Sequence, residues 1–113
     1  MSAILEQLEQ VLAERRQAKS DTSYVAKLHS KGLNKILEKV GEESFETVLA
    51  ARDFADQRTD CNQTALLGEV ADLWFHTMVM LSHLNLRHDQ VLAVLEQRFG
   101  LSGLEEKANR PQE

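Results

Sequence analysis

The chain has 113 residues, 42% hydrophobic and 27% charged, and a formal net charge of −5. Its excess of 18 acidic over 13 basic residues disfavours nucleic acid as a partner, because phosphate backbones are held by clustered Lys and Arg. We find neither the apolar core of a signal peptide nor a run of about 20 apolar residues, so we expect no membrane partner. With one cysteine, Cys61, no internal disulfide forms, and we expect a cytoplasmic protein.

The chain is predicted to be all-α, a helical bundle in one domain over residues 1–113 with a frayed tail at 109–113. Its one proline is Pro111, and apolar residues recur at helical spacing from the first residues onward. Polar segments at 19–23 and 57–62 predict a turn and a loop. A final short helix is predicted from the capping-box spacing of Ser102 and Glu105. The other expected helices cover residues 3–18, 24–30, 33–56, 63–84 and 89–99.

The helix expected over residues 63–84 is apolar on nearly every side. A helix with such a surface is buried on most faces. A chain of 113 residues has difficulty covering it alone, so we expect the bundle to be completed by homo-oligomerisation, as a dimer or a higher oligomer.

Three carboxylates lie close together in the helix expected over residues 33–56. Glu42 and Glu46 are one turn apart on one face, and Glu43 lies at its edge. Lys35 and Lys39 occupy the same face just before them. Taken alone, this pattern favours a solvated helix face with ion pairs to Lys35 or Lys39.

A second carboxylate pair, Glu69 and Asp72, lies on the apolar helix that follows. Charges on a helix buried on most sides cost several kcal/mol each unless they are paired or bind a cation. If the two helices pack antiparallel, this pair faces the first carboxylate set. A pocket of several carboxylates needs a counter-charge, and Mg²⁺ or Mn²⁺ prefers oxygen ligands of this kind. The sequence therefore predicts a divalent-metal site between the two helices.

A di-iron centre is the competing interpretation of these residues. It would require a Glu-x-x-His pair on each of two helices. Asp72 and His76 are instead four residues apart, and no second such pair exists. We therefore interpret His76 as a hydrogen-bonded core histidine.

The pattern Glu43-x-x-Glu46 followed by Glu69-x-x-Asp72 resembles the metal-binding signature of the MazG-like all-α nucleoside-triphosphate pyrophosphohydrolases. The segment SYVAKLHSKGLNKILEKVGEESFETVLAARD, residues 23–53, is similar to the first half of the phosphoribosyl-ATP pyrophosphatases of histidine biosynthesis. The later segments EVADLWFH and LEQRFGLSGLEEKANR are similar to the rest of that family. The resemblance covers residues 23–110.

The resemblance implies hydrolysis of phosphoribosyl-ATP to phosphoribosyl-AMP and pyrophosphate in a homo-oligomer, with Mg²⁺ as cofactor and Mn²⁺ as a substitute. A metal-bound or carboxylate-held water would attack the α-phosphorus. Glu42 or Glu43 is our candidate for the residue that orients it. The implied metal ligands are Glu43, Glu46, Glu69 and Asp72. The implied contacts to phosphate or ribose groups are Tyr24, Lys27, Lys31, Lys35 and Lys39.

One departure from the family and two other functions keep the interpretation open. Gly68 stands where the family often has a further acidic residue, which leaves the number of metal ions open. A house-cleaning pyrophosphohydrolase acting on (d)NTPs would share the carboxylates without needing the SYVAKL and RFGLSG segments. A non-catalytic helical interaction module would leave the acidic face solvated and use the apolar helix to bind a partner.

Overall fold

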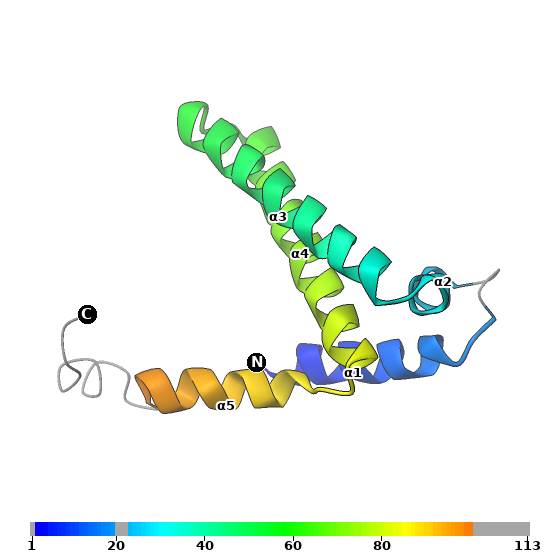
Figure 1. Cartoon of the computed structure of the whole chain (residues 1–113). Helices are drawn as coiled ribbons and strands as arrows, with labels where there is room; N and C mark the ends of the chain where they lie inside the picture. The colour runs from blue at the N-terminus through cyan, green and yellow to red at the C-terminus, as the bar shows by residue number, and fades with distance from the viewer. Residues whose placement is uncertain (1, 20–22, 101–113) are drawn as a thin grey trace.

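The computed structural model describes residues 2–19 and 23–100, and all secondary structure in these ranges is helical (Figure 1). The predicted all-α fold is therefore confirmed. None of the described helices is long and apolar enough to cross a membrane. The helix predicted from Ser102 and the tail at 109–113 lie outside the described residues. The five helices are α1 (Ser2–Arg16), α2 (Tyr24–Lys31), α3 (Leu33–Asp56), α4 (Asp60–His83) and α5 (His88–Phe99).

The two longest helices, α3 and α4, form an antiparallel hairpin that makes most of the tertiary contacts (Figure 1). α2 lies at the beginning of α3 and packs on α1. α1 crosses the far end of the hairpin, where α4 ends, and α5 leads away from the same end. The antiparallel hairpin is the arrangement that the two carboxylate sets require in order to meet.

Two residues, Gly32 and Thr59, explain the turns that precede the two long helices. Gly32, between α2 and α3, has a φ of 96°, in the region that glycine adopts without steric cost. Thr59 caps α4, because its side-chain oxygen accepts a hydrogen bond from the Asn62 backbone N–H. The predicted loop over 57–62 was therefore too long, since this cap and the acidic Asp60 begin α4 three residues earlier than expected.

Replacing Thr59 with alanine is expected to lower the free energy of unfolding by about 1 kcal/mol, because the Asn62 N–H loses its acceptor. Thr64→Ala is the matched control, since Thr64 is exposed in the interior of the same helix. There, alanine has the higher helix propensity and no cap is lost. Urea unfolding of both variants measures the difference, and equal effects would contradict the cap assignment.

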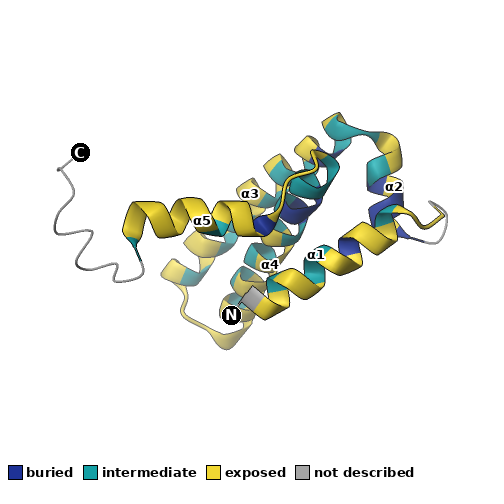
Figure 2. Ribbon diagram, turned by 90° about the horizontal axis from the view of Figure 1, so that it is seen from below, coloured by how far each residue is buried: buried dark blue, intermediate teal, exposed yellow. Residues whose placement is uncertain are grey.

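The buried core lies where α1, α2 and the adjoining ends of α3 and α4 meet (Figure 2). Ile36 and Val79 are completely buried there. The rest of the hairpin is poorly covered: Phe45 is 64% exposed, Leu67 60% and Trp74 58%. α4 was expected to be buried on most sides, but within one chain this holds only for the part nearest its end, because α3 is the only described helix that packs on its first half. The core residues are Leu12, Val25, Leu28, Ile36, Met78 and Val79.

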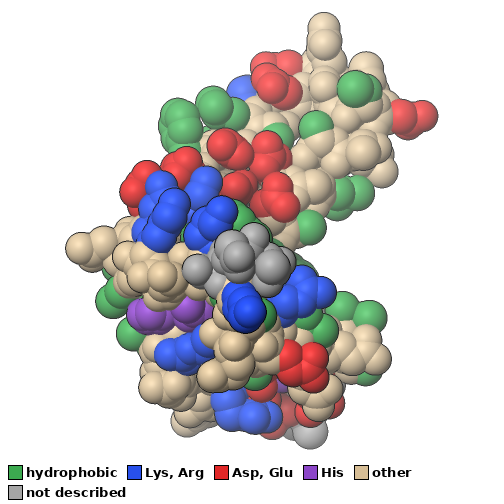
Figure 3. Space-filling view, turned by 90° about the vertical axis from the view of Figure 1, so that its right-hand side faces the viewer, with side chains coloured by type: hydrophobic (Ala, Val, Ile, Leu, Met, Phe, Trp, Pro, Cys, Tyr) green, Lys and Arg blue, Asp and Glu red, His purple; other side chains and the backbone are tan. Residues whose placement is uncertain are grey.

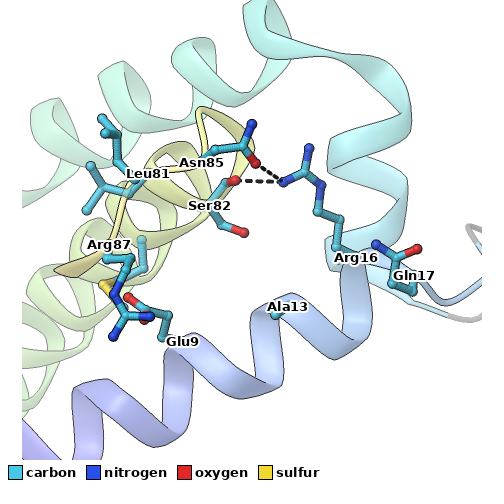
Figure 4. A pocket seen from close by; sticks show the side chains of 10 residues that line it. Glu9, Ala13, Arg16, Gln17, Leu81, Ser82, Asn85 and Arg87 are labelled. Atoms are coloured by element: carbon cyan, nitrogen blue, oxygen red, sulfur yellow. Dashed lines mark hydrogen bonds and ion pairs between the residues drawn. The ribbon is translucent and has the colours of Figure 1, made fainter. Parts of the chain in front are cut away.

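Polar contacts fasten α1 to the turn between α4 and α5, around a pocket of about 340 Å³ (Figure 4). The Arg16 guanidinium donates to the Ser82 carbonyl at 2.7 Å, which joins the end of α1 to the end of α4. The Glu9 carboxylate accepts from the His88 backbone N–H at 2.8 Å and lies 2.7 Å from the His88 ring. Burial acts to raise the Glu9 pKa, but the His88 hydrogen bonds and the Arg87 charge outweigh it, so the pKa is lowered. This pocket lies apart from the predicted metal ligands.

Candidate functional site

The hairpin brings together three of the four predicted metal ligands, one from α3 and two from α4. One carboxylate oxygen each from Glu43, Glu69 and Asp72 lies within 4.8 Å of the other two. We call these three residues the carboxylate cluster. Glu43 is the α3 member, and Glu69 and Asp72 are i, i+3 on α4, which places both on one side of that helix. The predicted juxtaposition across the two helices is present within a single chain.

Glu46, the fourth predicted ligand, borders the carboxylate cluster on its exposed side. Its charge contributes to raising the pKa values of both Glu43 and Glu69. It also lines a pocket of about 220 Å³ together with Glu69, Asp53 and Asn62.

Thr47 lies between α3 and α4 beside the carboxylate cluster. Its hydroxyl donates to the Glu43 carbonyl of the preceding turn at 2.7 Å and lies 3.3 Å from the Glu69 carbonyl of α4. One side chain therefore contacts the backbones that carry two of the acids. The sequence analysis missed this residue, although its place one turn after Glu43 was a signal that could have identified it.

The carboxylate cluster holds more negative charge than its surroundings balance. Burial and the repulsion of Glu46, Asp72 and Glu69 raise the pKa of Glu43 from 4.5 to about 7. Burial and the charges of Glu46 and Asp72 also raise the pKa of Glu69. The Glu43 Oε2 atom is buried and accepts no hydrogen bond from any described residue. A divalent cation would satisfy this oxygen and neutralise the repulsion, so the residues present fit such an ion.

Glu42 lies outside the carboxylate cluster. Its carboxylate is 3.9 Å from Lys39, in an exposed ion pair along α3. Lys35 forms a similar pair with Glu38 at 3.3 Å. Exposed pairs of this kind contribute little to stability and can exchange partners readily. Both lysines therefore remain available to an incoming anion.

Basic side chains lie directly beside the acidic group on one face of the molecule (Figure 3). Lys27 and Lys31 are exposed on α2, one turn apart, and Lys35 and Lys39 are one turn apart at the start of α3. The structure thus gathers the predicted lysines on two consecutive elements next to the carboxylates. This neighbourhood of cation-binding and anion-binding groups suits a metal–phosphate ligand.

Tyr24, the remaining predicted substrate contact, is connected to α4 through His76. Its hydroxyl lies 3.0 Å from His76 Nε2, and His76 Nδ1 lies 2.8 Å from the Asp72 carbonyl oxygen. His76 is buried and hydrogen-bonded, as expected. We did not infer from its spacing of four residues from Asp72 that it would lie beside the site. The contact joins the start of α2 to the part of α4 that carries the carboxylates.

The helical hairpin with carboxylates from both arms defines an all-α protein of the MazG-like nucleoside-triphosphate pyrophosphohydrolase type. A family model described as phosphoribosyl-ATP pyrophosphohydrolase matches residues 5–99, and the chain belongs to this family. Its activity is the hydrolysis of phosphoribosyl-ATP to phosphoribosyl-AMP and pyrophosphate in histidine biosynthesis. The enzyme is divalent-metal-dependent and takes a nucleotide as substrate.

Proposed function

We propose that phosphoribosyl-ATP is hydrolysed at the carboxylate cluster, with Mg²⁺ held by Glu43, Glu46, Glu69 and Asp72. The observation that carries this proposal is the approach of three carboxylate oxygens within 4.8 Å of one another. The buried Glu43 oxygen without a hydrogen bond supports it. Oxygen ligands alone favour Mg²⁺ or Mn²⁺ over metals that prefer nitrogen or sulfur.

Negatively and positively charged side chains have different roles in the proposed reaction. When bound, the divalent cation neutralises charge on the triphosphate and on the departing pyrophosphate. Phosphate oxygens are bound by four lysines, Lys27, Lys31, Lys35 and Lys39. Of these, Lys35 and Lys39 release their exposed carboxylate partners when the substrate binds. Positively charged side chains at these oxygens stabilise the charge that develops as the phosphoanhydride bond breaks.

A glutamate orients the water that attacks the α-phosphorus, and we propose Glu42 or Glu43 for this role. Glu42 is exposed and outside the carboxylate cluster, so it can accept a proton without losing a ligand. Glu43 is nearer to the other carboxylates, with one oxygen within 4.8 Å of an oxygen of Glu69 and of Asp72, so it lies closer to a water held at the metal site. Comparison of Glu42→Gln with Glu43→Gln at saturating Mg²⁺ separates the two, since loss of the residue that orients the water lowers kcat even when the metal site is filled.

A second copy of the chain is proposed to cover the exposed apolar side of the hairpin. A groove of about 510 Å³ between α4 and α5 is lined mainly by apolar side chains, among them Leu73, Trp74, Val91 and Leu95. Trp74 remains 58% exposed in the single chain. A surface of this size and character is typical of an interface between subunits. A sedimentation mass of one chain at micromolar concentration would contradict the homo-oligomer.

We also propose that residues 1–113 form one domain and that the reaction takes place in the cytoplasm. Each described helix packs on at least one other, and α5 contacts α1, which supports the single domain. Limited proteolysis and cell fractionation test the two statements separately.

Pyrophosphate release tests the substrate and the cofactor together. With Mg²⁺, kcat/KM for phosphoribosyl-ATP is expected to exceed that for dCTP, dUTP or ATP by about 100-fold or more, because only the full substrate reaches all the polar contacts. Excess chelator should abolish release, and Mn²⁺ should restore it. Equal turnover of dCTP would favour a house-cleaning enzyme instead.

A further inference from the structure

The Tyr24–His76–Asp72 contact fixes the direction of both of its hydrogen bonds. A backbone carbonyl can only accept, so the bond between His76 Nδ1 and the Asp72 carbonyl at 2.8 Å requires the proton on Nδ1. A neutral imidazole then has no proton on Nε2. The Tyr24 hydroxyl, 3.0 Å from Nε2, must donate its single proton to that nitrogen.

The other tautomer would place two lone pairs against each other. If Nε2 carried the proton, Nδ1 would face the Asp72 carbonyl oxygen at 2.8 Å without a hydrogen between them. An acceptor facing an acceptor in a buried place is costly, and His76 is only 6% exposed. The observed geometry therefore favours one arrangement, in which the Tyr24 oxygen keeps its lone pairs and has no proton left to give.

The Tyr24 side chain lies partly on the surface, where a ligand can contact it. The side chain is 49% exposed, although its ring lies 6.3 Å from that of Phe75 in a stacked arrangement. His76 is one helical turn, about 6 Å along the axis, beyond Asp72. The α-phosphate is joined to its ribose through one ester oxygen. A sugar next to a phosphate at the carboxylate cluster would therefore lie close to the helical turn of α4 that contacts Tyr24.

We propose that His76 is a positioning residue that presents the Tyr24 oxygen as a hydrogen-bond acceptor for a hydroxyl of the ribose next to the α-phosphate. The inference rests on the proposed function, because it assumes that the α-phosphate binds at the carboxylate cluster. Phosphate oxygens at neutral pH only accept, so Tyr24 cannot bind them while it donates to His76. Sugar hydroxyls can donate. Tyr24 thus recognises the sugar, and the lysines bind the phosphates.

Two inhibitors that differ only in their sugar hydroxyls test the proposal. ATP and 2′,3′-dideoxy-ATP, each with Mg²⁺, are compared as inhibitors of phosphoribosyl-ATP hydrolysis. For the unmodified enzyme, Ki should be about tenfold higher for the dideoxy compound, the effect of one hydrogen bond. In Tyr24→Phe, Ki for ATP should rise to the dideoxy value and the ratio should fall to about one. A ratio that persists in Tyr24→Phe, or Ki values that rise equally for both inhibitors, would overturn the proposal.

His76→Leu removes the acceptor and should collapse the same ratio, whereas a merely structural loss would raise both Ki values together. His83→Gln is the control, because His83 lies on the same helix and contacts His29 instead. Tyr24→Phe removes one hydroxyl from a half-exposed side chain, so it keeps the test decisive even if His76→Leu fails to fold.

Nitrogen-15 NMR at pH 8 provides an independent reading of the tautomer. Long-range nitrogen–proton correlations should show His76 with its proton on Nδ1, and a proton on Nε2 would overturn the proposal. Failure of the unmodified enzyme to release pyrophosphate with Mg²⁺ would instead count against the proposed function, so the two failures are distinguishable.

Discussion

Replacing Glu69 with glutamine is expected to lower turnover of phosphoribosyl-ATP about a thousandfold and to weaken Mn²⁺ binding strongly. Glutamine keeps the size of the side chain but removes its charge. Glu69 belongs to the carboxylate cluster, in which one oxygen from each of the three residues lies within 4.8 Å of the other two. A metal ion in such a site supplies several kcal/mol of charge stabilisation, and each 1.4 kcal/mol corresponds to about tenfold in rate. The fold should persist, because removing one of several crowded carboxylates relieves repulsion.

Steady-state kinetics and calorimetry with Mn²⁺ measure the two effects of Glu69→Gln. Glu14→Gln is the matched control, since it makes the same chemical change at an exposed position of α1. It should leave both turnover and Mn²⁺ binding unchanged. Normal Mn²⁺ binding by Glu69→Gln would remove Glu69 from the ligand set. A chain that binds no Mn²⁺ before or after the change would favour the non-catalytic helical module.

Protonation of Glu43 is expected to make metal affinity depend on pH. Its pKa of about 7 in the metal-free protein means that at pH 6 most molecules hold a proton on this carboxylate, and at pH 8 few do. Because the cation must displace that proton, the apparent affinity for Mg²⁺ should rise about tenfold from pH 6 to pH 8. Calorimetry at the two pH values, in buffers of different protonation enthalpy, should also show proton release at pH 6.

Glu43→Gln should bind the cation more weakly and lose this pH dependence, apart from what the raised pKa of Glu69 still contributes. An unmodified enzyme whose Mg²⁺ affinity is the same at pH 6 and pH 8 would contradict the assignment. Glu14→Gln again serves as the control and should retain the full dependence.

The same raised pKa determines how pH acts on the stability of the metal-free protein. Between pH 4.5 and about 7 the folded Glu43 binds a proton more tightly than the unfolded residue does. The free energy of unfolding should therefore fall as pH rises through this range, and bound Mg²⁺ should restore it at pH 8.

The helices and the meeting of the acids were predictable because they depend on local patterns. Apolar periodicity set the bounds of α3 correctly, and the positions of Glu43, Glu69 and Asp72 predicted that the two arms of a hairpin would bring them together. The start of α4 was misplaced because one side chain, Thr59, caps it within a stretch that is otherwise polar and loop-like. A single capping hydrogen bond does not change the spacing of apolar residues, so their periodicity does not locate it.

The contacts that involve distant parts of the chain could not be predicted in the same way. Nothing in the spacing of Tyr24 and His76, 52 residues apart, indicates that their side chains meet. The joining of α1 to the end of α4 through Arg16 is likewise a product of packing. Periodicity identified α4 as apolar all round, but not which part of it one chain would cover.

The central claim is that carboxylates of α3 and α4 together hold the divalent cation that the reaction requires. Anomalous diffraction from crystals grown with Mn²⁺ tests it most directly. The account predicts a manganese peak bounded by Glu43 from α3 and by Glu69 and Asp72 from α4. A peak bounded by carboxylates of one helix alone, or located away from these residues, would contradict it.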